Sequence, residues 1–141
     1  MGYIKIIDFG LAKILTTMEE ANTFCGTPEY FAPEMITQQG HDLTVDWWAV
    51  GILIFEMMFG CTPFFNSNRG VLYTKIKQSR GVFPSKRTFA IEYSDELVDL
   101  IVKLLKKNKE ERLGSLNDAT EILSHPWFAG MDVAALESYQ V

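Results

Sequence analysis

The chain has 141 residues, of which 48% are hydrophobic and 22% charged, and its formal net charge is −5. This length is enough for one domain with a core, and the balance of apolar and charged residues excludes a disordered chain. The net acidity argues against nucleic acid as a partner and favours partners that carry Lys or Arg.

Two further features indicate where such a chain works. The longest apolar run, residues 47–59, is too short for a membrane span and contains Glu56. Cys25 and Cys61 have no Cys/His partners at metal-ligand spacing, which indicates two reduced thiols. We therefore expect a soluble cytoplasmic protein without a membrane span, with the nucleus left open as a second location.

The first third of the chain predicts a strand, then a loop, then a short helix. Residues 3–7 are β-branched and aromatic, which predicts a strand, and residues 16–31 lack periodicity, which predicts an ordered loop. Pro33 fits the first turn of a short helix that runs to about Thr37.

The longest predicted helix covers residues 45–59. Thr44 is the expected N-cap, and Gly60 lies just past the end. The segment is apolar on nearly all sides, which is typical of a helix at the centre of a domain. Trp47 and Trp48, and later Trp127, are expected in the core.

Amphipathic helices follow. Residues 69–78 predict a short helix, and Ser94 is the expected cap of another whose buried stripe comprises Leu97, Leu100, Ile101, Leu104 and Leu105. Asp118 and Glu121 have the spacing of a capping box for a last helix that ends near His125. The tail from residue 129 is expected to be loosely held. The predicted fold class is mainly α, with a short β element at the N-terminus.

Asp8-Phe9-Gly10 is the first motif that suggests chemistry. A carboxylate at the end of a rigid strand is a suitable oxygen ligand for Mg²⁺, which bridges the phosphates of ATP. The tripeptide alone is a weak signal, since an Asp at a strand end before a turn glycine occurs by chance.

The segment from residue 26 to 34, Gly-Thr-Pro-Glu-Tyr-Phe-Ala-Pro-Glu, is much more specific. With Asp-Trp-Trp-Ala-Val-Gly at 46–51 and Arg-Leu-Gly at 112–114, the chain resembles the Ser/Thr protein kinases, and within them the AGC group. The resemblance implies the C-terminal portion of the kinase large lobe, part of a domain that is α+β when intact. We expect a partial kinase domain over residues 1–128 and the start of an AGC-type C-terminal tail over 129–141.

The resemblance implies roles for residues of the activation segment. Asp8 would hold Mg²⁺ and thereby ATP, and Phe9 would pack in the core. Thr23 would be phosphorylated by an upstream kinase and pair with Lys13, because a phosphate orders a loop through cations. Thr27 would bond to the catalytic Asp.

Further roles concern the protein substrate and the core. Phe24, Pro28 and Phe31 would line the pocket for the residue after the phosphoacceptor. Glu29 and Glu56 would bind Arg or Lys near the phosphoacceptor of protein substrates; a solvated surface role is the alternative for both. Structural roles are implied for three residues: Glu34 would form a buried ion pair with Arg112, and Asp46 would anchor the catalytic loop.

Other parts of a kinase do not occur within these 141 residues. There is no Gly-x-Gly-x-x-Gly, no Val-Ala-Ile-Lys-like strand and no His-Arg-Asp. We therefore expect the chain alone to be inactive, to bind ATP and Mg²⁺ poorly, and to expose an apolar patch. The alternative is a non-catalytic, pseudokinase-like module that binds or regulates other proteins.

Overall fold

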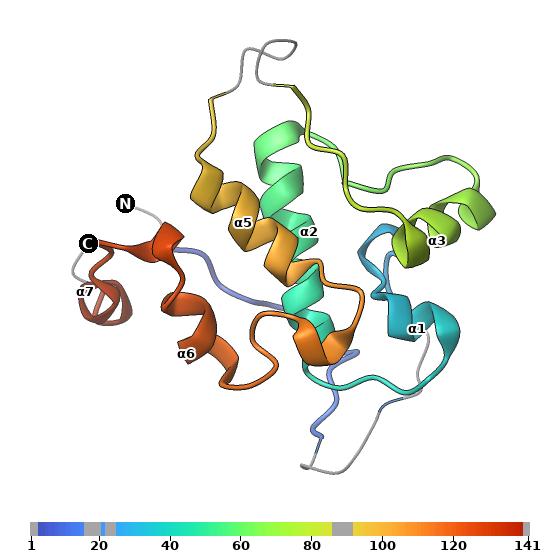
Figure 1. The fold of residues 1–141 in the computed structure, drawn as a ribbon. Helices are drawn as coiled ribbons and strands as arrows, with labels where there is room; N and C mark the ends of the chain where they lie inside the picture. Colours follow the sequence, from blue (N-terminus) through green and yellow to red (C-terminus); the bar gives the residue numbers. More distant parts are fainter. Residues whose placement is uncertain (1–2, 16–20, 22–24, 86–91, 140–141) are drawn as a thin grey trace.

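The computed structural model describes residues 3–15, 21, 25–85 and 92–139 (Figure 1). The described part is mainly helical, which confirms the predicted fold class. Its α-helices are α1 (Pro33–Thr37), α2 (Thr44–Phe59), α3 (Arg69–Gln78), α5 (Asp95–Leu104), α6 (Asp118–Leu123) and α7 (Val133–Glu137). Short 3-10 turns are η1 (Pro28–Tyr30), η2 (Lys109–Glu111) and η3 (Pro126–Phe128). No helix in the described part is both long and apolar enough to cross a bilayer.

Helix α2 begins one residue earlier than predicted. Thr44 is its first residue, so the prediction that Thr44 is the N-cap is wrong. The backbone N–H and the hydroxyl of Thr44 instead both donate to Asp42 Oδ1, at 2.9 and 2.6 Å. The Asp42 carboxylate thus satisfies a free N–H at the helix start. Gly60 ends the helix as predicted, with a φ of 73° that a residue without a Cβ adopts at little cost.

Helices α2 and α5 lie side by side at the centre of the molecule (Figure 1). The Ser94 hydroxyl caps α5 as predicted, accepting from the backbone N–H of Leu97 at 3.2 Å. The α5 stripe is buried at Leu97, Leu100, Ile101 and Leu104. Burial of such side chains contributes about 1.5–3 kcal/mol each, so this contact organises the domain.

A second part of the core forms where α2 meets α1 and α3. It is centred on Trp48, which is fully buried and stacks on Phe64 with ring centroids 5.8 Å apart. The other α2 tryptophan, Trp47, is half-buried and donates its indole N–H to Asp118 Oδ1 at 2.9 Å. Trp127 is 39% exposed, so its predicted place in the core is wrong. It packs edge-on against Phe128 at the surface.

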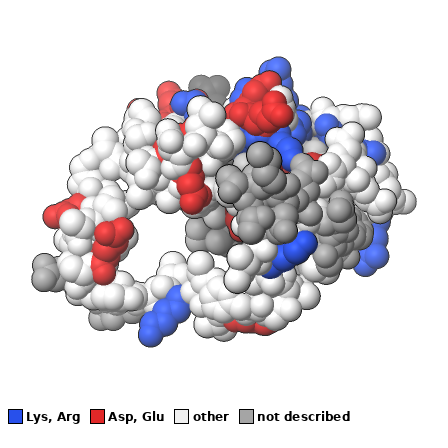
Figure 2. All heavy atoms as spheres, turned by 90° about the horizontal axis from the view of Figure 1, so that it is seen from below, with Lys and Arg blue, Asp and Glu red and all other residues white. Residues whose placement is uncertain are grey.

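The predicted strand over residues 3–7 is absent. Residues 3–15 are irregular and form no ladder with any described segment; the described residues contain a single β-bridge, between Ala21 and His41. A strand needs a neighbour that pairs with its N–H and C=O groups, and no segment among the described residues pairs with this one. Ile4, Ile6 and Ile7 are 80–97% exposed, so this segment is loosely covered. Figure 2 shows that the molecule as a whole is also open, with a gap that passes through it.

The C-terminal region differs from prediction in its capping. Asn117, not Asp118, is the N-cap of α6, and its side chain makes no capping hydrogen bond. Glu121 Oε2 accepts from the backbone N–H groups of Gly114, Leu116 and Asn117 at 3.0–3.3 Å. The Glu121 carboxylate therefore stabilises the turn over residues 114–117, rather than capping a single residue. The tail contains the short helix α7.

Candidate functional site

Asp8 occupies a tight turn in the irregular N-terminal segment. Its φ of 64° lies in the left-handed region, where Asp is enriched among non-glycine residues, and its Oδ1 accepts from the Gly10 N–H at 3.2 Å. Phe9, predicted in the core, is 70% exposed. No described segment covers the Phe9 ring, so the prediction that Phe9 packs in the core is wrong for this structure.

The carboxylate of Asp8 is chemically suited to bind Mg²⁺, but one carboxylate is not a complete set of ligands. No group of three or more His, Cys, Asp or Glu side chains in the described ranges could hold a metal ion. Mg²⁺ commonly takes one or two protein carboxylates and completes its octahedron with water and phosphate oxygens. Asp8, exposed at a turn, fits the role of one such ligand.

A pair of carboxylates surrounds Tyr30. Glu56, in the last turns of α2, accepts a hydrogen bond from the Tyr30 hydroxyl. Glu29, next to Tyr30 in η1, accepts from the buried hydroxyl of Thr62 at 2.7 Å. The end of η1 is therefore tied to the C-terminal part of α2 and to the turn after it, and each carboxylate accepts from a hydroxyl of another segment.

The electrostatics of Tyr30 reflect these two carboxylates. Burial of the phenol, the hydrogen bond to Glu56, and the negative charges of Glu56 and Glu29 raise the pKa of Tyr30 to about 12. All of these effects oppose a further negative charge. Burial would disfavour a charge of either sign, whereas the two carboxylates would stabilise a positively charged side chain placed here. The cluster is therefore suited to bind a cation such as a guanidinium or ammonium group.

The structure brings Glu34 of α1 and Arg112 together as a two-pronged ion pair. Arg112 Nη1 lies 2.6 Å from Glu34 Oε1, and Nη2 lies 2.9 Å from Oε2. Arg112 is fully buried, and it also donates to the backbone oxygens of Thr44 at 3.0 Å and Lys106 at 3.1 Å. One guanidinium thus joins the helix after η1, the start of α2 and the loop after α5.

Other predicted site residues are placed without contacts that define a role. Thr27 is exposed at the start of η1, Pro28 is half-buried, and Lys13 is exposed. Phe31 is only 4% exposed and faces Tyr73 at 6.5 Å between ring centroids, so little of its ring is open to a ligand. Thr23 and Phe24 lie outside the described residues.

Asp46 lies on the exposed side of the first turn of α2. Partial desolvation of its carboxyl raises the pKa of Asp46, the negative charge of Asp118 raises it further, and His41 opposes the shift. An anchoring role for Asp46 stays a prediction, as do the roles of Thr27, Pro28 and Lys13.

Sequence reasoning missed Tyr30 and Thr62. The residues they contact are 26 and 33 positions away, so no local spacing pattern signals either hydrogen bond. The only signal was indirect: Tyr30 stands inside the specific segment 26–34, next to Glu29.

Comparison with known proteins identifies the family to which this chain belongs. The protein kinase domain family matches residues 1–128. The chain belongs to the protein kinase family. The match includes the Asp8 turn, the carboxylate cluster around Tyr30 and the Glu34–Arg112 pair. It also confirms the resemblance that segment 26–34 indicated.

Individual kinases are similar over most of this chain. It is 45% identical over 136 residues to the human cAMP-dependent protein kinase catalytic subunit PRKX, covering 96% of this chain and 36% of that kinase. It is 43% identical over 132 residues to the Dictyostelium discoideum cAMP-dependent protein kinase catalytic subunit, covering 93% and 19%. It is 42% identical over 132 residues to the Aspergillus fumigatus Serine/threonine protein kinase ypkA, covering 93% and 20%. The chain thus spans about a third or less of the length of these relatives.

Proposed function

We propose that this chain is the activation-segment and helical portion of an AGC-type Ser/Thr kinase that phosphorylates proteins near basic residues. The observation that carries the proposal is the carboxylate cluster around Tyr30, with Glu29 held by Thr62 and Glu56 held by Tyr30. Two oriented carboxylates on one surface attract Arg or Lys side chains of a substrate and give them a fixed place. The kinase relatives support the reaction class.

The remaining residues would act around that surface. Asp8 would hold the Mg²⁺ that neutralises the phosphates of ATP during transfer of the γ-phosphoryl group. Thr27 would position the catalytic Asp, and Pro28, Phe24 and Phe31 would contact the residue after the phosphoacceptor. Phosphorylated Thr23 would pair with Lys13 and order the loop between them.

Binding of a basic peptide tests the substrate preference directly. We expect a fluorescent peptide with two arginines before a serine to bind this chain more tightly than its citrulline counterpart, which lacks the charge. Glu29→Gln and Glu56→Gln should each weaken binding by about tenfold, the effect of losing one charge-assisted hydrogen bond. Glu137→Gln, an exposed carboxylate on α7, is the matched control. Equal binding of the two peptides would refute the basic preference.

A non-catalytic binding module is the second candidate. The carboxylate cluster around Tyr30 suits this candidate too, because two oriented carboxylates would bind a basic partner whether or not a phosphoryl group is transferred. Calorimetry with MgATP and the 141-residue chain examines this point: we expect no binding at submillimolar concentration. The in-frame coding sequence before Met1 separates the candidates, because a His-Arg-Asp-Leu-Lys-x-x-Asn segment there supports the kinase and its absence supports the module.

A further inference from the structure

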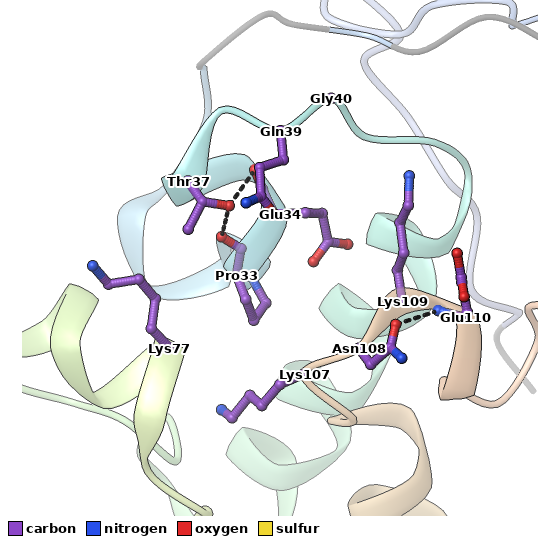
Figure 3. A pocket seen from close by; sticks show the side chains of 10 residues that line it. All are labelled: Pro33, Glu34, Thr37, Gln39, Gly40, Lys77, Lys107, Asn108, Lys109 and Glu110. Atoms are coloured by element: carbon purple, nitrogen blue, oxygen red, sulfur yellow. Dashed lines mark hydrogen bonds between the residues drawn. The ribbon is translucent and has the colours of Figure 1, made fainter.

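A pocket of about 430 Å³ opens between α1, the end of α3 and the loop that follows α5 (Figure 3). Its walls include Pro33, Glu34 and Thr37 from α1, Lys77 from α3, and residues 107–110. It shares no lining residue with the carboxylate cluster around Tyr30. The pocket is therefore a separate feature that the proposed kinase function does not use.

The ammonium group of Lys107 is buried without a hydrogen-bond acceptor in the described structure. Its Nζ lies 4.0 Å from the centre of the Phe64 ring and 4.7 Å from that of Trp48. Burial, and the nearby charge of Arg112, lower the pKa of Lys107 to about 8. Contacts with ring faces offset only part of the cost of burying a charge, and an anionic acceptor would offset more.

The other charges of the pocket leave positive charge in excess. Lys77 is exposed and makes no ion pair with any described residue. Lys109 Nζ is held by Asp42 at 3.2 Å, and the Glu34 carboxylate is taken by Arg112. Glu110 is the other carboxylate among the lining residues. The pocket wall thus carries two lysines without an acidic partner, Lys77 and Lys107, and one further carboxylate, that of Glu110. The chain as a whole has a net charge of −5.

Figure 3 shows the two lysines on neighbouring parts of the pocket wall. Lys77 comes from α3 and Lys107 from the loop after α5; the end of Lys107 is turned toward α3, whereas the end of Lys77 points away from Lys107. Rotation about the side-chain bonds of Lys107 would move its Nζ from the ring faces toward an acceptor in the pocket. The volume of the pocket is in the range of sites that bind organic ligands, and exceeds what a single inorganic anion fills.

We propose that this pocket binds an acidic peptide, with Lys107 and Lys77 each able to receive a carboxylate or phosphate group of that peptide. Both groups accept hydrogen bonds from ammonium donors, and the bonds are strengthened by charge and by the partly desolvated site. Thr37 and Gln39 also line the pocket and would offer polar groups to the peptide backbone. The proposal does not depend on phosphoryl transfer by this chain.

Fluorescence anisotropy with three matched peptides tests the proposal. The probes are a labelled heptapeptide with three central glutamates, the same peptide with glutamines, and one with a single phosphoserine. We expect saturable binding of the glutamate peptide, the phosphoserine peptide or both, and none of the glutamine peptide; which one binds more tightly identifies the preferred anionic group. Lys107→Met should weaken binding about tenfold and Lys77→Met severalfold, while Lys5→Met, which removes a remote exposed charge, should not.

Thermal melting of the same variants separates binding from folding. Lys107→Met removes a buried, unpaired ammonium and places an apolar chain against Trp48 and Phe64, so its Tm should stay the same or rise. If Lys107→Met lowers the Tm and leaves affinity unchanged, Lys107 is structural and the proposal is wrong. It is also wrong if Lys5→Met weakens binding as much as Lys77→Met, or if the glutamine peptide binds as tightly as both anionic probes. Lys77, being exposed, gives a test that does not depend on the core.

Discussion

Tyr30 reports the state of the carboxylate cluster through its own ionisation. Because Glu56 contributes to the rise in the pKa of Tyr30 to about 12, Glu56→Gln should move this pKa down toward the ordinary value of about 10. Ultraviolet titration of the phenol groups measures it, and Tyr30→Phe identifies the late-titrating component. An unchanged late component in Glu56→Gln would contradict the cluster.

The same raised pKa makes a prediction for stability. The folded state holds the Tyr30 proton more tightly than the unfolded chain does, so its contribution is fully present below pH 10. That contribution is lost as the pH rises through about 12. Denaturant melts across this interval should show a smaller loss in Tyr30→Phe than in the parent chain.

Glu34 and Arg112 are the pair whose loss should cost most among single polar changes. Glu34→Gln leaves the guanidinium of a fully buried arginine without its counter-charge, so the free energy of unfolding should fall by about 3–5 kcal/mol. Urea denaturation measures the change, and Glu137→Gln on the exposed face of α7 is the control. Similar losses in the two variants would show that the buried pair contributes little.

At the scale of elements, the contact between α2 and α5 depends on Gly51. A Cβ added at Gly51 would lie 2.9 Å from Leu104 Cβ and 2.9 Å from Leu105 Cδ2, closer than carbon atoms pack. Gly51→Ala should therefore force the helices apart and lower stability by about 1–3 kcal/mol, despite the better helix propensity of Ala.

Gly70 in α3 provides the matched control for this prediction. A Cβ there meets only Asn68 Oδ1, at 3.3 Å, so Gly70→Ala should change stability by less than about 1 kcal/mol. Calorimetric melts of both variants compare them directly. If Gly51→Ala melts like Gly70→Ala, the helices tolerate separation and the close approach is not a constraint.

Element prediction succeeded where the signal was local. The bounds of α1 and α3, the Ser94 cap and the Gly60 stop follow from turn residues and apolar spacing within a few positions. It failed where the outcome depends on a distant neighbour. The residues at 3–7 suit a strand, but without a second strand alongside they remain irregular.

For the molecule as a whole, the N-terminal segment leaves large apolar side chains in solvent. Ile4, Ile6, Phe9 and Ile14 are between 70% and 97% exposed, and on α2 Met57 is 67% exposed. Apolar surface of this kind is unusual for a monomeric protein. We expect the isolated chain to bind a hydrophobic dye and to self-associate in sedimentation experiments.

Substitution tests whether this segment is the cause. Replacing Ile4, Ile6 and Ile14 by Ser should reduce dye binding and association without lowering the Tm, because these side chains make little contact with the core. Replacing the exposed α5 residue Val102 by Ser is the control. A parent chain that is monomeric, melts cooperatively and binds no dye would rule out the expected apolar patch.

The family and most helix positions follow from the amino-acid sequence without the structure. Segment 26–34 is specific because its residues are adjacent, and caps and apolar stripes act over one or two turns. Only the tertiary structure shows the hydrogen bonds from Thr62 to Glu29 and from Tyr30 to Glu56. The same is true of the contact between the Lys107 ammonium and the rings of Phe64 and Trp48. The Glu34–Arg112 pair was implied by the family resemblance, but its further bonds to Thr44 and Lys106 were not. The partners in these contacts are far apart in the chain, and only the packing of α1, α2 and the loop after α5 brings them within bonding distance.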